Sequence, residues 1–408
     1  MRRYILLKIT LFFALLLLLS LHGFSQTFSL PTPTGNYSVG TTNFTLKDVY
    51  REETFTEEKY DFREFTVRAW YPADDVSGNV TLKYLAGYNA DTLKYFWNMF
   101  DIPEKLFDLI GEVNTNSYVN ATVSGNRSSY PVIIFSHGYG LGIPELYTFM
   151  AEELASNGFI VLSLTHPYES VEIETGGKSI YLSEERANQM LQENLMEYAV
   201  MKNASTDEER IEATKSVLEN SPIAQESLKE WVKDAEFLLN QLDSPSGMIP
   251  LFLLDKMDKQ NIGALGHSFG GAMSGQLALY DSRIKAVMNM DGFQYGDLLG
   301  KDLNFSYAMI YSDANKLMND AILKSGSGDL YTIIIPKTYH FAFTDMIAYP
   351  PVFDKGSFTG DVNQITFIPL MDELMVNYFN KYLYNENVEF PSEEIMSKYI
   401  GNIDLIRK

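Results

Sequence analysis

The chain contains no cysteine among its 408 residues. This absence excludes a disulfide framework, a metal site built on thiolates and a cysteine nucleophile. It leaves export from the cell open, because a chain of this length buries enough apolar surface to be stable without disulfides.

Positive charge is also scarce. The 32 lysine and arginine residues stand against 53 aspartate and glutamate residues, so the formal net charge is -21. Such a balance argues against nucleic acid as a partner and against adsorption to anionic membranes, because both would repel an acidic surface. We expect a small-molecule ligand and predict no stable protein partner.

A long apolar run occurs at the N-terminus. Arg2 and Arg3 precede an almost unbroken apolar stretch over residues 9–21, which small and polar residues follow. This order is typical of a secretory signal peptide. We therefore expect residues 1–26 to be cleaved and residues 27–408 to fold as a periplasmic or secreted protein. The alternative is an uncleaved membrane anchor, although a spanning helix needs about 20 apolar residues.

The remainder of the chain alternates strand patterns with helix patterns, and no internal repeat is evident. Short apolar runs are typical of strands that are covered on both faces. We expect such strands at residues 131–136, 159–165, 261–265, 284–290, 306–311 and 330–335. The alternation predicts an α/β fold with a central, mostly parallel sheet flanked by helices.

Residues 180–227 interrupt this alternation with a helical and acidic stretch. Within it, Thr206 and Glu209 have the spacing of a capping box. The stretch lies between sheet elements and ahead of the strand at 261–265, so we expect a helical cap insertion. An apolar stripe over residues 228–242 follows and should pack back on the sheet.

The strand at 261–265 leads into Gly266-His-Ser-Phe-Gly270, which fits the pattern G-x-S-x-G, and a helix pattern begins at Ala272. Strand, sharp turn and helix form the context of a nucleophile elbow. Such a turn strains the serine backbone, and the two glycines remove Cβ atoms that would collide with the strand and the helix. We therefore expect Ser268 to be a nucleophile, with the N–H of Phe269 free to face an oxyanion.

A serine nucleophile needs a base, and histidine suits this role because its pKa lies near neutrality. The chain has only 5 histidines. The side chain of His267, inside the elbow, is expected to point away from the chemistry. His340 lies just after the last strand, as the chain order serine, acid, histidine requires. The other histidines do not fit by position: His22, His137 and His166.

Two aspartates are candidates for the acid that orients this base. Asp313 follows the strand at the more usual place, but its surroundings equally suit a turn or a helix N-cap. Asp291 ends the strand directly after the elbow helix and follows a largely apolar strand tip, which would hold its carboxylate beside the sheet edge. The pattern favours Asp291 and leaves Asp313 open. Asp345 and Asp354 are expected to be solvated loop acids, with Asp345 at the rim of the site.

The oxyanion of ester hydrolysis needs two preorganised N–H donors. Phe269 supplies one. The second should come from the loop after the strand at 131–136, where Gly138 lets the backbone approach and Tyr139 follows. We assign the second donor to Tyr139; the alternative is a tight turn at the strand end. This chemistry implies no cofactor and no metal.

These segments together resemble the platelet-activating factor acetylhydrolase family of the plasma, calcium-independent type, within the α/β-hydrolases. The resemblance covers residues 30–383. It rests on Pro33-Thr-Gly-Asn-Tyr-Ser-Val-Gly40, Arg51, Val67-Arg-Ala-Trp-Tyr-Pro72, Phe135-Ser-His-Gly138, Gly266-His-Ser-Phe-Gly-Gly271, Met290-Asp-Gly292 and Thr338-Tyr-His-Phe-Ala-Phe-Thr-Asp345. It implies the α/β-hydrolase fold and the roles nucleophile for Ser268, acid for Asp291, base for His340 and backbone donors for Tyr139 and Phe269.

The resemblance implies a secreted serine ester hydrolase that acts on short-acyl, including lipid-derived, esters. The same motifs occur in bacterial polyester hydrolases and in dienelactone-hydrolase-like proteins, and the acidic insertion at 180–227 departs from the family pattern. The substrate class therefore stays open between these enzymes and a peptidase or thioesterase of the same fold. An inactive binding protein on the same scaffold is the alternative outside the enzymes.

Overall fold

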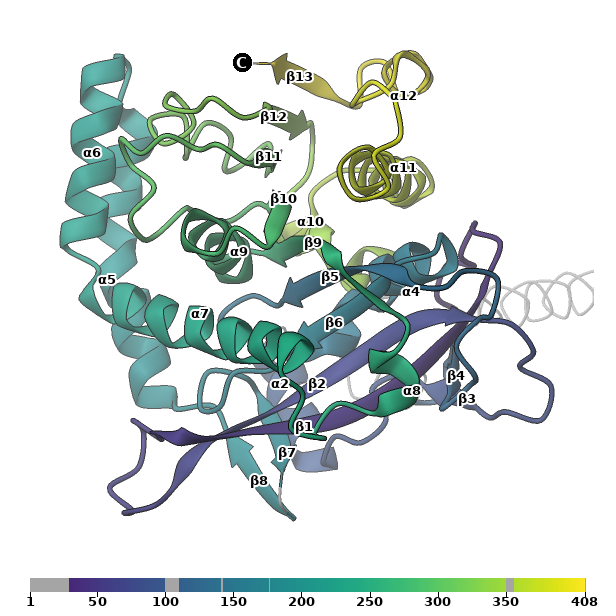
Figure 1. The fold of residues 1–408 in the computed structure, drawn as a ribbon. Helices are drawn as coiled ribbons and strands as arrows, with labels where there is room; N and C mark the ends of the chain where they lie inside the picture. Colours follow the sequence, from purple (N-terminus) through teal and green to yellow (C-terminus); the bar gives the residue numbers. More distant parts are fainter. Residues whose placement is uncertain (1–28, 100–109, 141, 176, 350–355, 408) are drawn as a thin grey trace, which may run out of the picture.

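A computed structural model describes residues 29–99, 110–140, 142–175, 177–349 and 356–407. Its centre is an 11-stranded sheet (Figure 1). The strands of this sheet are β1 (Ser38–Glu52), β2 (Phe62–Ala73), β3 (Thr81–Lys83), β4 (Asn114–Val119), β5 (Tyr130–Ser136), β6 (Ile160–Leu164), β9 (Met257–His267), β10 (Ile284–Met290), β11 (Ser306–Ser312), β12 (Leu330–Ile335) and β13 (Asp404–Arg407).

The order of the strands across the sheet is β13-β12-β11-β10-β9-β5-β6-β2-β1-β4-β3. From β6 through β5 and β9 to β12, all neighbours run parallel, whereas β2 lies antiparallel between β1 and β6. Strands β5, β6, β11 and β12 are buried at every residue, as expected of strands that are covered on both faces. The predicted mostly parallel sheet is confirmed.

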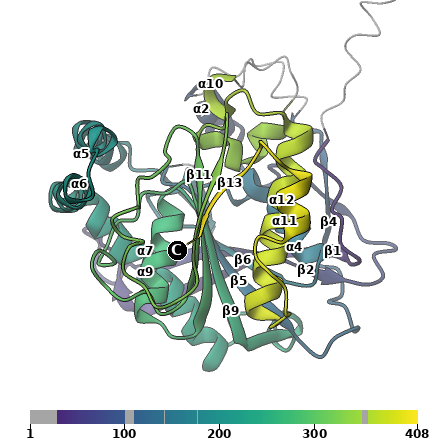
Figure 2. The ribbon, with the colours of Figure 1, turned by 90° about the horizontal axis from the view of Figure 1, so that it is seen from above.

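Helices cover the sheet on both faces (Figure 2). The longer helices are α2 (Ala90–Met99), α4 (Thr148–Ser156), α5 (Glu184–Asn203), α6 (Asp207–Glu219), α7 (Pro222–Asp243), α9 (Phe269–Tyr280) and α11 (Gln364–Leu383). The shorter elements are η1 (Pro144–Tyr147), α8 (Leu251–Leu254), η2 (His340–Phe343), η3 (Asp345–Ala348), α10 (Gly356–Thr359), α12 (Glu393–Lys398) and the hairpin strands β7 (Glu172–Thr175) and β8 (Lys178–Tyr181).

Two apolar cores lie on the two faces of the sheet. Strand β5 shows the division: Ile133 and Phe135 face the core that contains α4 and α11, whereas Val132 and Ile134 face the core that contains α7 and α9. This alternation follows from the two-residue period of a strand. The parallel pairing from β5 through β9, β10 and β11 to β12 places the loops that follow these strands at one edge of the sheet, where the predicted site residues lie.

The predicted helical insertion, residues 180–227, contains the end of β8, the helix pair α5 and α6, and the start of α7. The pair stands on the side of α7 and α9 (teal in Figure 1), and Met190 and Met201 of α5 are buried against the core on that face. The capping box is present: Glu209 N donates to Thr206 Oγ1 at 3.1 Å, and Thr206 N donates to Glu209 Oε2 at 3.0 Å. That residues 180–227 act as a cap remains a prediction.

The expected signal peptide, residues 1–26, lies outside the described residues, so its cleavage stays a prediction. Among the residues that the structure describes, every helix falls short of the length or the apolar character that crossing a membrane requires.

Candidate active site

The turn at Ser268 has the geometry that the nucleophile elbow predicts. Ser268 adopts φ 57° and ψ −123°, a region that L-residues rarely occupy, and α9 begins at the next residue. A Cβ atom at Gly266 would collide with the backbone of Gly270, and one at Gly270 would collide with the carbonyl oxygen of Ser136. Both glycines are therefore required by close backbone approach, as the sequence predicts.

His340 lies next to Asp291, with 2.7 Å between Nδ1 and Oδ2. The Asp291 side chain is fully buried, and two further donors hold it: Ser312 N donates to Oδ1 at 2.7 Å and Asn315 Nδ2 donates to Oδ2 at 2.8 Å. A carboxylate held in this way fixes the orientation of the imidazole at Nδ1. The other ring nitrogen, Nε2, is then available as a base.

Asp313, the alternative acid, lies elsewhere. Its side chain is 42% exposed and pairs with Lys316, with 2.9 Å between Oδ1 and Nζ. This hydrogen bond holds the pKa of Asp313 below its ordinary value. Of the two candidates from the sequence, the structure brings Asp291 to His340.

The expectation that Asp345 is a solvated loop acid is wrong. Its side chain is fully buried and accepts the backbone N–H groups of Thr148 at 3.1 Å and Phe149 at 3.2 Å, at the start of α4. The 3-10 turns η2 and η3 fold the segment after His340 back onto this helix, whose N-terminus attracts a carboxylate. Burial raises the pKa of Asp345 to about 8. Asp354 lies outside the described residues.

His267 contacts His340, the proposed base, and the sequence did not indicate this contact. Its Nδ1 is 2.9 Å from Tyr147 Oη, and its Nε2 is 3.0 Å from the carbonyl oxygen of His340. The two imidazole rings lie 4.5 Å apart between centroids. The expectation that this side chain points away from the chemistry is therefore wrong, because folding brings the loop after β12 against the elbow.

The loop after β5 lies against Ser268, the proposed nucleophile. A Cβ atom at Gly138 would be 3.3 Å from Ser268 Cβ. The Gly138 N–H donates to Tyr147 Oη at 3.1 Å and is therefore occupied, whereas the N–H of Tyr139 has no such partner within the described residues. Phe269 is the first residue of α9, where helix N–H groups lack intrahelical acceptors. Both proposed oxyanion donors thus border Ser268.

A buried ionic network lies beside this loop. Asp234 of α7 accepts from Arg63 Nη2 at 2.8 Å, from His166 Nδ1 at 2.8 Å and from Arg51. Burial alone would raise the pKa of Asp234, but Arg63 and these hydrogen bonds lower it. His166 Nε2 is 3.0 Å from Ser136 Oγ, so the network ends at the last residue of β5. Removing one partner of such a buried pair destabilises a fold by about 3–5 kcal/mol.

Three buried histidines should remain neutral in mildly acidic solution. Burial lowers the pKa of His137 to about 3 and that of His166 to about 4. It also lowers the pKa of His267 well below 6.5. In the unfolded chain, each imidazole should have an ordinary pKa of about 6.5.

We expect the free energy of unfolding to fall as the pH decreases from 6.5 toward 4. The sign follows because the unfolded chain binds these protons in this window and the folded protein does not. The effect should be on the order of 1 to 3 kcal/mol for each imidazole. Chemical denaturation across the pH range measures it, and histidine NMR spectra identify the groups. An imidazolium signal from His137 or His166 in folded protein at about pH 6 would contradict the expectation.

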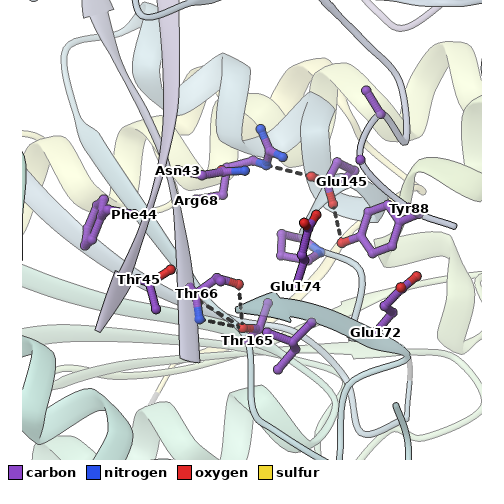
Figure 3. Close-up of a pocket in the computed structure, with 14 residues that line it drawn as sticks. Asn43, Phe44, Thr45, Thr66, Arg68, Tyr88, Glu145, Thr165, Glu172 and Glu174 are labelled. Atoms are coloured by element: carbon purple, nitrogen blue, oxygen red, sulfur yellow. Dashed lines mark hydrogen bonds and ion pairs between the residues drawn. The ribbon is translucent and has the colours of Figure 1, made fainter. Parts of the chain in front are cut away.

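A cavity of about 200 Å³ lies between β1, β2, β7 and the start of η1 (Figure 3). In its wall, Glu145 accepts from Tyr88 Oη at 2.7 Å and pairs with Arg68 Nε at 2.6 Å, and Glu172 accepts from Asn89 N at 3.1 Å. These carboxylates are already paired, and the described ranges contain no group of histidine and acidic side chains suited to a metal ion. The proposed catalytic residues do not line this cavity.

The sequence matches the family described as "Platelet-activating factor acetylhydrolase, isoform II" over residues 22–387. It is 26% identical to the platelet-activating factor acetylhydrolase of Bos taurus over 282 residues, which are 65% of this chain and 55% of that protein. It is 25% identical to the protein of the same name from Cavia porcellus over 368 residues, 87% of this chain and 78% of that protein. The chain thus spans about half the length of the bovine relative.

Among solved structures, a ferulic acid esterase from Streptomyces cinnamoneus superposes with a TM-score of 0.68 at 18% identity. The superposition covers 93% of this chain and 99% of the esterase chain. At this identity the likeness shows the fold alone. Together with the order of the strands, it confirms the predicted α/β-hydrolase fold.

Proposed function

The chain belongs to the platelet-activating factor acetylhydrolase isoform II family, and we propose that it is a serine ester hydrolase. The observation that carries this proposal is the contact of 2.7 Å between His340 Nδ1 and Asp291 Oδ2, at the sheet edge where the strained turn presents Ser268. A nucleophile, a base and an acid at the ends of three strands of an α/β-hydrolase sheet suit acyl transfer.

In the proposed mechanism, His340 takes the proton from Ser268 Oγ as this oxygen attacks the ester carbonyl carbon. The N–H groups of Tyr139 and Phe269 then stabilise the negative charge on the carbonyl oxygen. The imidazolium, stabilised by Asp291, gives its proton to the leaving alcohol. A water molecule, deprotonated by His340, attacks the acyl-enzyme; the acid departs and Ser268 regains its proton.

We propose short-acyl esters as the substrate class, because the relatives are named acetylhydrolases. On a panel of p-nitrophenyl esters, kcat/KM should be highest for acetyl and butyryl groups and lower for octanoyl by on the order of 10-fold. Matched amides and thioesters should react more slowly. Faster cleavage of the octanoyl ester would contradict the acyl preference, and faster cleavage of the amide or thioester would indicate the peptidase or thioesterase alternative.

We further propose that the mature enzyme is exported, because the first 26 residues have the order of a signal peptide. The intact mass of the protein recovered outside the cytoplasm tests this. A full-length chain in the membrane fraction would support the anchor alternative instead.

A further inference from the structure

The two residues that carry the proposed oxyanion donors pack against one indole. The Tyr139 ring stacks on Trp231, with 6.0 Å between centroids and 5° between planes. The Phe269 ring meets the same indole edge-on, at 4.9 Å and 87°. Tyr139 and Phe269 also contact each other, at 5.6 Å and 88°. The three rings form a closed triangle, so a shift of Trp231 would move both donor residues.

The indole itself is held firmly. His166 stacks on Trp231 with 3.8 Å between centroids and 9° between planes, and the indole is fully buried. Trp231 Nε1 donates to Glu169 Oε2 at 2.6 Å. The position of Trp231 is therefore set by an aromatic stack and by one carboxylate.

Glu169 also holds the Tyr139 loop directly. Tyr139 Oη donates to Glu169 Oε1 at 3.1 Å, and Gly140 N donates to the Glu169 carbonyl oxygen at 3.1 Å. Ser227 of α7 donates to the same carboxylate, and Arg186 of α5 pairs with it at 3.3 Å. A fully buried carboxylate is tolerated only with such partners. Glu169 therefore connects the loop after β5 with α5 and α7.

We propose that Glu169 and Trp231 are positioning residues that set the separation and direction of the Tyr139 and Phe269 N–H groups. The inference rests on the proposed hydrolytic function. Oxyanion donors act on an atom whose charge develops only in the transition state. A misplacement of about 1 Å costs on the order of 10²-fold in rate, and a loss confined to the transition state lowers kcat more than it changes KM.

Glu169→Ala should lower kcat on p-nitrophenyl acetate by on the order of 10²-fold, with KM changed by less than about threefold. The affinity for a trifluoromethyl ketone, whose serine adduct carries the oxyanion, should fall in parallel. Glu169→Gln should recover most of kcat, because its amide oxygen can still accept from Trp231 and its amide N–H groups can donate to the Tyr139 and Ser227 hydroxyls.

A matched control is Glu152→Ala in α4. Glu152 is also fully buried and accepts from Asn116 Nδ2 at 2.8 Å and Ser117 Oγ at 2.6 Å. Its replacement should lower the melting temperature and leave kcat within about threefold of the wild-type value. Equal losses of kcat in the two alanine variants would make Glu169 a structural residue only and would overturn the inference.

If Glu169→Ala does not fold, Trp231→Phe and Tyr139→Phe decide the question. The first keeps an aromatic ring and removes the Nε1 donor, and the second removes one hydroxyl. Each should lower kcat by about 10-fold with little change in KM. Wild-type kcat in both would overturn the inference and leave the proposed function standing, whereas wild-type protein without ester turnover would overturn both.

Discussion

Ser268→Ala should lose on the order of 10³-fold or more of ester turnover and keep the wild-type fold. The expected loss is large because the hydroxyl forms the covalent bond, so the variant retains only what binding and the oxyanion donors supply. Folding should be little affected, since alanine keeps the Cβ atom of the strained turn. Steady-state hydrolysis of p-nitrophenyl acetate measures the loss, and circular dichroism checks the fold.

Ser274→Ala is the matched control for this variant. Ser274 is a buried serine of α9, the helix that begins directly after Ser268. Its Oγ donates to the Gly270 carbonyl oxygen at 2.9 Å. Ser274→Ala should retain ester turnover and should still react with a fluorophosphonate, whereas Ser268→Ala should form no adduct with this reagent. Undiminished hydrolysis by Ser268→Ala would refute the mechanism. Folded wild-type protein without an adduct on Ser268 would favour an inactive binding protein.

Asp291→Asn should lower kcat/KM on the same ester by on the order of 10³- to 10⁴-fold. The asparagine cannot accept from His340 Nδ1, Ser312 N and Asn315 Nδ2 in the way that the carboxylate does. At least one of these donors would face an amide N–H, which favours the wrong imidazole tautomer and destabilises the imidazolium.

Asp313→Asn provides the comparison, because the sequence proposes both acids and Asp313 pairs with Lys316. It should leave kcat/KM within about threefold of wild type, since exposed ion pairs contribute little. A large loss in Asp313→Asn together with a small loss in Asp291→Asn would show that the acid is wrongly assigned.

The strands nearest the site could be predicted from the sequence because they are covered on both faces of the sheet. Strands β10 and β12 have the predicted bounds, since a largely apolar run that is covered on both faces stands out from its neighbours. The turn at Ser268 was predictable for a related reason. Glycines at both flanks and a strained serine are local requirements of one backbone turn, and they leave a pattern within five consecutive residues.

The choice between the two acids depends on contacts that no local pattern encodes. Asp291 and Asp313 both follow buried strands. The parallel pairing of β10 with β11 brings Ser312 N to Asp291, and Asn315 follows. The donors that fix the carboxylate therefore belong to the neighbouring strand and to the loop after it. From the sequence, the apolar strand tip favoured Asp291, and the resemblance to a known family supported this choice over Asp313.

Short-range chemistry thus specifies the elbow, the capping box at Thr206 and the buried strands, because each depends on residues adjacent in the chain. Asp345 at the start of α4, His267 against His340, and Glu169 between Tyr139 and Trp231 depend instead on how distant segments pack. Burial and long-range hydrogen bonds arise only once the crossovers place these segments together. Hence the sequence alone is enough to propose a nucleophile, whereas the residues that hold the site in place can be identified only from the folded structure.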